Sequence, residues 1–275
     1  MFSKVVFWCE FPEKVDWRQA ENLLKGLPVE VYVAVRDVRE YQHWKRKTRL
    51  RVYPWPVLSK EDGYWFSGFT SRESIEKLRQ FKGLKIKIDL EPPLPRWQYS
   101  NFRIVAYAFR KLFQKGENSE YLQQVIYEVA GRESGVVMKN VALLVNEFPF
   151  ARWYLKRQGT YVELKKGMQK NCMCYTSFAG GFFRPLIRVY LRWFMKKSVA
   201  ADRNVGFSLG LIGHGILGKE GTYKHVEQFK QDLKMAADSG CRNIAVYSID
   251  AILKRDNPGE WVEAVRGFMS RTRGS

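Results

Sequence analysis

Short apolar segments alternate with longer segments of mixed polarity along the chain. The short segments are rich in β-branched and aromatic residues, which is typical of strands buried in a parallel sheet. This pattern predicts eight strands, at residues 5–9, 29–35, 50–54, 84–90, 141–145, 171–176, 205–212 and 244–249.

The segments between the predicted strands have the apolar spacing of helices that cover a sheet. Helices are predicted at residues 17–25, 38–47, 71–81, 102–114, 119–131, 152–158, 184–197, 226–239 and 258–269. Thr70 or Ser71 is expected to cap the third of them. The alternation predicts an α/β fold, a single-domain (β/α)8 barrel of the TIM type over residues 1–275, with extra helices after strands 4 and 6. An open doubly wound sheet is the alternative, although no predicted strand ends in a GxGxxG segment.

Acidic residues end or follow at least five of the predicted strands, and barrel enzymes build their active sites at these strand ends. Asp89 and Glu91 are two positions apart, so their side chains are expected on one face of a strand, where repulsion and burial raise one pKa. Glycoside hydrolysis uses two carboxyl groups of different pKa, and Glu91 is the expected acid with Asp89 as its partner. Helix capping is the alternative role for Asp37 and Asp250. The candidate catalytic residues are Glu91, Asp89, Glu147, Glu10 and Asp250.

Two of these strand ends resemble those of known glycosidases. The Ile-Asp-Leu-Glu segment at 88–91 resembles the D-x-E strand ending of lysozyme-like and chitinase-like TIM barrels, and Asn-Glu at 146–147 resembles the pair that ends a strand in another large glycosidase clan. The segment Gly-His-Gly at 213–215 departs from that second clan, which has its nucleophilic Glu there. The resemblance implies a barrel glycosidase whose catalytic pair is Asp89 and Glu91.

Three further segments are similar to a group of barrel proteins with no assigned activity: Trp-Pro-Val-Leu at 55–58, Glu-Asp-Gly-Tyr-Trp at 61–65 and Asp-x-Glu-Pro-Pro at 89–93. Several aromatic rings lie at strand ends, where flat rings can stack on sugars, although core packing is the alternative role for each. The expected substrate-binding residues are Trp8, Trp55, Tyr64, Trp65, Tyr175 and His214.

Six glycines between positions 206 and 221 surround the loop after the seventh predicted strand. Barrel enzymes often bind phosphate in this loop through backbone N–H groups, whereas a tight turn is the structural alternative. Gly213, Gly215 and Arg36 are therefore candidate anion-binding residues. With His214 they make a phosphodiesterase or another phosphate-handling enzyme the second functional hypothesis.

The net charge is +19, and twelve basic but two acidic residues lie between Ala151 and Arg203. Such a field attracts anionic lipids, nucleic acids or phosphorylated substrates. Arg184, Arg188, Arg192 and Lys196 are four residues apart, beside Trp193, and predict a basic stripe on an interfacial helix; residues 102–115 repeat the pattern. A noncatalytic nucleic-acid-binding protein is the third hypothesis, although no known binding motif is present.

The sequence also predicts the location of the protein and its use of cofactors. No run of about 20 apolar residues and no signal-peptide pattern is present. The expected location is therefore cytoplasmic, and any membrane that the protein contacts is met at its inner face. The four cysteines do not form a CxxC pair, and neither a metal nor a cofactor is predicted. The leading hypothesis is a glycoside hydrolase-like enzyme that acts on a lipid-linked or anionic glycan, or glycolipid, at an anionic membrane surface.

Overall fold

The computed structural model describes residues 2–91, 114–130, 136–140, 149–179, 182–216, 218 and 220–270. Strands and helices alternate through these residues, as the sequence predicts. The strands are β1 (Lys4–Cys9), β2 (Glu30–Val35), β3 (Val52–Pro56), β4 (Ile86–Leu90), β5 (Val136–Asn140), β6 (Met168–Met173), β7 (Gly206–Leu209) and β8 (Asn243–Tyr247).

Helices follow most of the strands. They are α1 (Trp17–Leu24), α2 (Val38–Lys47), α3 (Arg72–Glu76), α5 (Ser119–Ala130), α6 (Pro149–Gln158), α7 (Arg184–Ala201), α8 (Val226–Asp238), α9 (Ile249–Ile252) and α10 (Pro258–Ser270). Two of them begin with the caps that their sequences favour. The Asp16 carboxylate accepts a hydrogen bond from Gln19 N at 3.0 Å, and the Ser71 hydroxyl accepts one from Ser74 N at 3.2 Å.

The strands follow the order β3-β2-β1-β8-β7-β6-β5-β4 by hydrogen-bonded neighbours. The strand pairs with a defined register are parallel. The α/β class with parallel strands is therefore confirmed. Phe66, in the loop after β3, adds an isolated parallel bridge to Leu90 at the end of β4.

The chain divides into two compact units. The first comprises Met1–Ala34, Tyr41–Tyr53 and Asn171–Ser275, and the second comprises Val35–Glu40 and Pro54–Lys170. A single domain over residues 1–275 remains a prediction from the sequence, and each unit is described by itself below.

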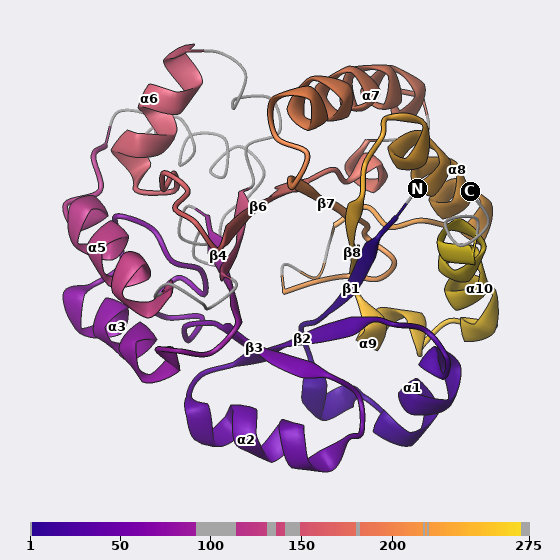
Figure 1. Cartoon of the computed structure of the whole chain (residues 1–275), viewed down its shortest axis with the longest axis horizontal. Helices are drawn as coiled ribbons and strands as arrows, with labels where there is room; N and C mark the ends of the chain where they lie inside the picture. Colours follow the sequence, from indigo (N-terminus) through magenta and orange to yellow (C-terminus); the bar gives the residue numbers. More distant parts are fainter. Residues whose placement is uncertain are drawn as a thin grey trace. The chain divides into compact units, whose positions relative to one another are not determined.

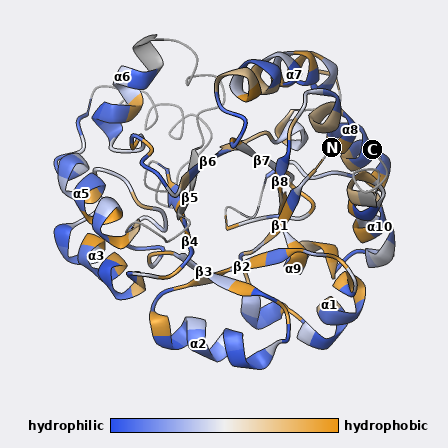
Figure 2. Ribbon diagram, viewed as in Figure 1, coloured by the Kyte–Doolittle hydropathy of each residue, from blue (hydrophilic) through white to orange (hydrophobic). Residues whose placement is uncertain are grey.

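In the first unit, β1 pairs with β2 on one side and β8 on the other, and β7 pairs with β8 and β6 (Figure 1). The helix α8 packs against α7 and α10, and α10 packs against α1. Figure 2 shows hydrophobic colours along β2 and both kinds of residue on α1, as expected for a helix that covers a buried strand.

Trp8 lies in the core of the first unit, although the sequence makes it a candidate for sugar stacking. Its ring is fully buried and meets Tyr32 edge-on at 5.3 Å between centroids. Its Nε1 donates a hydrogen bond to Ser208 Oγ at 3.1 Å, and Ser208 in turn donates to Asn171 Oδ1. Trp8 thus packs and orients β1 against β7, as buried Trp residues with a paired N–H commonly do.

In the second unit, β4 pairs with β5, and α5 packs against α3 and α6. The observed β5 precedes the predicted strand at 141–145, and residues 141–148 lie outside the described part of the chain. Of the predicted helix at 102–114, residues 102–113 also lie outside it. Within the strand pair, Ile86 is opposite Val136 and Leu90 is opposite Asn140.

The basic stripe predicted on α7 is not an exposed row of charges. Arg184 is buried, and Arg188 Nε pairs with Asp232 Oδ1 of α8 at 2.7 Å. Arg192 lies 4.0 Å from Asp238, while Lys196 is exposed. The helix is present, but Arg184 is buried and Arg188 turns toward the protein, where α8 supplies the buried carboxylate of Asp232. Neither is placed to contact a lipid headgroup.

Candidate active site

Three buried polar side chains meet where β1 and β8 end in the first unit. Glu10 directly follows β1, Tyr247 ends β8, and Asp250 lies in the first turn of α9. The register of the two strands places Trp8 opposite Tyr247. Because parallel neighbours end at the same edge of a sheet, the residues that follow them lie close together. Glu10, Tyr247 and Asp250 are all no more than 5% exposed.

Hydrogen bonds join these three residues. The Tyr247 hydroxyl donates to Glu10 Oε2, and the Glu10 backbone N–H donates to Asp250 Oδ1 at 3.0 Å. A hydroxyl that donates to a carboxylate stabilises its charged form. The arrangement therefore fixes the position of Glu10 through its backbone and favours an ionised side chain.

A second carboxylate, that of Glu220, approaches Glu10 across Gly215. A Cβ atom at Gly215 would lie 3.0 Å from Glu10 Oε2, 3.1 Å from Glu220 Oε1 and 2.7 Å from the Tyr247 hydroxyl. The two carboxylate oxygens are thus no more than about 6 Å apart, because both lie near one point beside Gly215. Gly215 is required here because a side chain would fill the space between these groups.

Glu220 is absent from the residues predicted from sequence. It lies in the glycine-rich loop between β7 and α8, well beyond the strand end where catalytic residues are expected. The spacing of Gly215 and Glu220 has no recognisable motif, so a close approach of backbone to carboxylate could be found only from the structure. The signal available in the sequence is the glycine itself, which marks close packing.

The buried Asp250 has a perturbed acidity. Burial raises the pKa of its carboxyl above the usual value, whereas hydrogen bonds from the Glu10 backbone, Ser248 and its own backbone partly lower it. Its carboxylate accepts the Glu10 N–H and contacts no reacting group in this arrangement, so we assign Asp250 as a positioning residue.

Asp250→Asn is expected to raise the free energy of unfolding at neutral pH. Since the folded-state pKa is raised, the wild type loses stability as pH rises from about 4 through that raised pKa, and the amide removes this loss while keeping an oxygen acceptor. Urea unfolding at a series of pH values measures the difference.

The matched control is Asp238→Asn, where a hydrogen bond from Lys234 lowers the pKa. There the sign reverses, and the variant should lose stability above about pH 4. If Asp250→Asn follows the wild type at every pH, the carboxyl of Asp250 does not carry the expected desolvation penalty.

Two further residues predicted to bind substrate, Tyr175 and His214, belong to the first unit. Tyr175 lies beside Tyr247, and His214 directly precedes Gly215 in the chain. The Tyr175 ring is 5.9 Å from the Tyr247 ring and 5.5 Å from the Phe178 ring, measured between centroids. Tyr175 is buried, Phe178 is half exposed, and His214 is exposed. The buried rings of Tyr247 and Tyr175 therefore lead to the exposed ring of Phe178.

The predicted anion site has an unfavourable environment at Gly215. Oxygens of Glu10 and Glu220 lie close to its Cα, and a Cβ at Gly213 would meet Ala251 at 2.7 Å. Two nearby carboxylates repel a phosphate unless one is protonated. Arg36, in the second unit, is exposed and lies 3.7 Å from Glu40. These contacts disfavour the phosphate-handling hypothesis.

The D-x-E residues belong to the second unit. Asp89 and Glu91 are buried, and Asp89 Oδ2 pairs with Lys87 Nζ at 2.8 Å. Lys87 is fully buried, and its ammonium lies 3.0 Å from the centroid of the Trp55 ring. Alternation along the strand predicts repulsion between two carboxylates here, whereas in the structure Asp89 pairs with the ammonium of Lys87.

The loop after β3 lies beside this strand end. Phe66 N donates to Asp89 O and Glu91 N donates to Phe66 O, both at 3.1 Å. Tyr64 is buried and Trp65 half-buried, with their ring centroids 5.7 Å apart. The second unit thus brings together the predicted residues Asp89, Glu91 and Trp55, while Glu147 lies outside the described residues.

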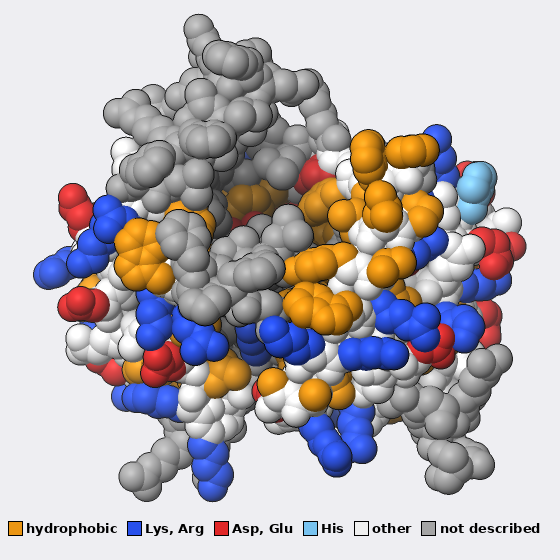
Figure 3. All heavy atoms as spheres, turned by 90° about the horizontal axis from the view of Figure 1, so that it is seen from above, with side chains coloured by type: hydrophobic (Ala, Val, Ile, Leu, Met, Phe, Trp, Pro, Cys, Tyr) orange, Lys and Arg blue, Asp and Glu red, His pale blue; other side chains and the backbone are white. Residues whose placement is uncertain are grey.

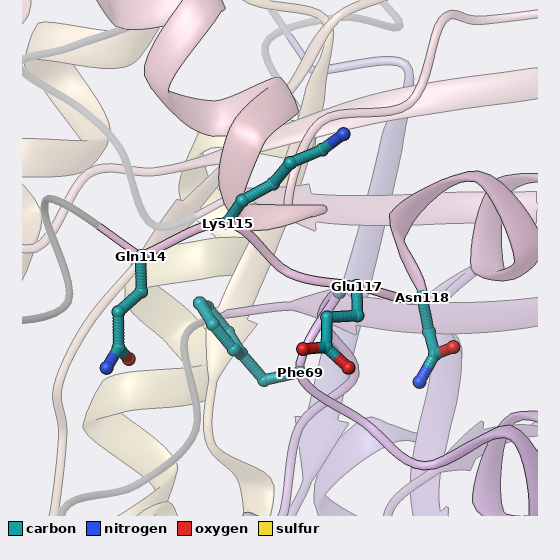
Figure 4. A pocket seen from close by; sticks show the side chains of 6 residues that line it. Phe69, Gln114, Lys115, Glu117 and Asn118 are labelled. Atoms are coloured by element: carbon teal, nitrogen blue, oxygen red, sulfur yellow. The ribbon is translucent and has the colours of Figure 1, made fainter.

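A separate pocket of about 340 Å³ lies in the second unit, lined by Gly68, Phe69, Gln114, Lys115, Glu117 and Asn118. In Figure 4 the side chains of Gln114, Glu117 and Asn118 point to one side and that of Lys115 to the other. Asn118 Nδ2 donates to Thr70 O at 3.0 Å, and its backbone N donates to Gly68 O at 2.9 Å. None of the predicted site residues lines this pocket.

In the part of the chain that the structure describes, no group of three or more His, Cys, Asp or Glu residues is arranged to hold a metal ion. None of the helices described combines the length and the apolar character needed to cross a membrane.

Comparisons with known proteins support a barrel-type fold. The fold is similar to that of the PgaB (BpsB) glycoside hydrolase domain from Bordetella bronchiseptica, with a TM-score of 0.56, 13% identity, and coverage of 97% of this chain and 98% of that one. It is also similar to dihydropteroate synthase from Yersinia pestis, with a TM-score of 0.50, 13% identity, and coverage of 100% and 94%. No protein-family model and no curated protein matches the sequence. At these identities the similarity concerns the fold alone.

Proposed function

We propose that this chain is a (β/α)8-barrel glycoside hydrolase that cleaves a lipid-linked or anionic glycan at a membrane surface. The observation that supports the chemistry best is the pair of carboxylates, Glu10 and Glu220, on either side of Gly215. The PgaB domain is described as a glycoside hydrolase domain. This agrees with the proposal, which does not depend on it.

The two carboxylates have different surroundings, as a nucleophile and an acid require. Glu10 accepts the Tyr247 hydroxyl, which favours its ionised form and suits it to attack an anomeric carbon. Glu220 lies in the loop, half-buried, and is the proposed proton donor. Asp250 holds the Glu10 backbone, and the exposed Phe178, which packs on the buried Tyr175, offers a ring on which a sugar can stack.

The proposed reaction has two steps. Glu220 gives its proton to the glycosidic oxygen as Glu10 attacks the anomeric carbon, so the bond to the leaving group breaks and a glycosyl ester of Glu10 forms. Glu220, now ionised, takes a proton from water, whose oxygen attacks the same carbon and releases Glu10. This two-step route retains the anomeric configuration.

The pair of Glu91 and Asp89 is the second candidate for the catalytic groups. It is favoured by one observation, namely that both carboxyl groups are buried at the end of β4, where Asp89 pairs with the ammonium of Lys87. In this version Glu91 is the acid and Asp89 is its partner. Loss of turnover in Glu91→Gln but not in Glu10→Gln would favour it.

Gly215→Ala is expected to lower kcat/KM for glycan hydrolysis by roughly 10²-fold, because the added methyl group would displace the Glu10, Glu220 or Tyr247 oxygen atoms. The assay is release of reducing ends from a panel of neutral and anionic glycans and aryl glycosides, with the wild type first establishing the substrate. Retention is checked by NMR of the first product.

Gly259→Ala is the matched control, because a Cβ there has no neighbour within 4 Å. Its activity should equal that of the wild type. Wild-type protein that cleaves no member of the panel would refute the hydrolase proposal for those substrates, and a fully active Gly215→Ala would move the site away from this loop.

A further inference from the structure

The outward face of α7 carries apolar side chains, in addition to those that its inward face buries in the core. Leu186, Val189 and Trp193 recur at three- and four-residue intervals and are 65%, 71% and 47% exposed. Residues at this spacing share one side of a helix. A helix that covers a sheet normally has its polar side in water, so an apolar outward side is unusual.

The inward side of α7 is already fully engaged. Leu191, Phe194 and Met195 are buried in the core, and Phe194 meets the Phe207 ring of β7 edge-on at 6.4 Å. Arg188 pairs with Asp232 and donates to Gln228 O at 3.0 Å. In the described part of the first unit, the outward apolar residues therefore lie outside the buried core.

Two phenylalanines extend this outward face beyond the start of the helix. Phe182 is 84% exposed and Phe183 is 59% exposed, with their rings perpendicular and 5.3 Å apart. The five residues Phe182, Phe183, Leu186, Val189 and Trp193 are called the α7 face below. Figure 3, which looks from the side of the molecule where α7 lies in Figure 1, shows hydrophobic side chains gathered there beside Lys and Arg. Exposed apolar clusters of this kind commonly mark an interaction site.

Cations surround the second half of the α7 face. Lys196 and Lys197 are exposed and flank Trp193, and the Lys197 ammonium lies 5.1 Å from the Trp193 ring centroid. Arg192 is also exposed on the neighbouring side of the helix. Aromatic and aliphatic groups with Lys and Arg beside them have the chemistry of a surface that enters the headgroup region of an anionic bilayer.

We propose that the α7 face docks onto an anionic lipid bilayer. A second copy of the chain fits less well, because pairing two such faces would bring Lys196 and Lys197 of both copies together on proteins of charge +19. The proposal deepens the proposed function, on which it rests for a membrane-borne glycan, and it names the contacting residues. It differs from the basic stripe predicted by the sequence, since apolar side chains rather than Arg184 and Arg188 make the contact.

The test is sedimentation with phosphatidylcholine vesicles, with and without phosphatidylglycerol, at low and high salt. Wild-type protein should pellet with the anionic vesicles and bind the neutral ones much more weakly. A triple variant, Phe182→Ser, Leu186→Ser and Trp193→Ser, should bind anionic vesicles at least about tenfold more weakly. Lys196→Gln with Lys197→Gln should weaken binding and reduce its salt dependence.

The matched control exchanges exposed apolar residues elsewhere, in Trp153→Ser with Leu164→Ser, which are 52% and 40% exposed. This variant should bind anionic vesicles as the wild type does. Because all the exchanged side chains are exposed, each variant should keep the wild-type Tm, which thermal unfolding checks.

Three results would overturn the docking proposal. They are failure of the wild type to bind anionic vesicles, equal binding by the triple variant, and a wild-type dimer that the triple variant converts to monomer. Loss of duplex RNA binding in the triple variant, without vesicle binding by the wild type, would assign the face to nucleic acid. Glu220→Gln should bind vesicles as the wild type does, because Glu220 is not part of the α7 face. A wild type that binds vesicles but cleaves no glycan would refute the hydrolase proposal and leave docking intact.

Discussion

Glu220→Gln is expected to lower kcat for glycan hydrolysis by roughly 10²- to 10⁴-fold, because an amide cannot give a proton to the leaving oxygen. The loss should be smaller for an aryl glycoside whose leaving group is acidic enough to depart without a proton. Glu10→Gln should reduce the hydrolysis of both substrates, because the attacking carboxylate is needed whatever the leaving group.

The contrast between leaving groups separates a chemical role from a structural one. A variant that merely disturbs folding would lose both activities in proportion. Glu227→Gln is the control, since Glu227 is exposed and its Oε1 accepts from Lys230 Nζ at 2.6 Å on the surface of α8. Wild-type activity in Glu220→Gln on the poorer leaving group would eliminate Glu220 as the acid, and Glu91→Gln, measured alongside, tests the second candidate.

Asp232→Ala is expected to lower the free energy of unfolding by about 3–5 kcal/mol, because it removes the anionic partner of a largely buried arginine. Asp232 is fully buried, and it accepts hydrogen bonds from Arg188 Nε at 2.7 Å, from the Tyr223 hydroxyl at 2.6 Å and from Thr176 Oγ1. Burial and the charge of Asp232 also raise the pKa of Tyr223 well above its usual range. The Tyr223 hydroxyl therefore keeps its proton and donates a hydrogen bond to Asp232.

Urea unfolding followed by circular dichroism measures this effect. The control is Asp238→Ala on the same helix, whose carboxylate pairs with Lys234 at 2.9 Å in solvent and should contribute about 0–1 kcal/mol. Equal losses in the two variants would mean that the buried network contributes no more than a surface ion pair. Asp232→Asn should fall between them, because it keeps an oxygen for the hydroxyls but not the charge.

Helix α7 shows what the periodicity of a sequence can predict and what it cannot. The sequence predicts a helix at 184–197, and the structure has one at Arg184–Ala201. The four-residue spacing of Arg184 and Arg188 correctly places them on one side, but it does not say whether that side faces water. Asp232 decides this, because a buried carboxylate from α8 stabilises an inward arginine that would otherwise remain in solvent.

The strand β4 shows the same limit for charge. Alternation along a strand predicts that Asp89 and Glu91 share a side, and Lys87 shares it too by the same rule. Whether Asp89 meets another carboxylate or an ammonium depends on side-chain conformation, and in the structure it pairs with Lys87. The pair and the Trp55 ring beside the ammonium follow from packing that the alternation does not specify.

The sequence by itself determined the alternation of strands and helices and the parallel α/β class. It also determined the presence of Glu10 and Asp250 at two strand ends. These features follow from the local spacing of apolar and polar residues along each helix and strand. The tertiary structure decided that Glu220 approaches Glu10 across Gly215 and that α7 presents its apolar side outward. Both depend on contacts between residues far apart in the chain, where the gain from burying or pairing a group is set by its partner rather than by its neighbours in sequence.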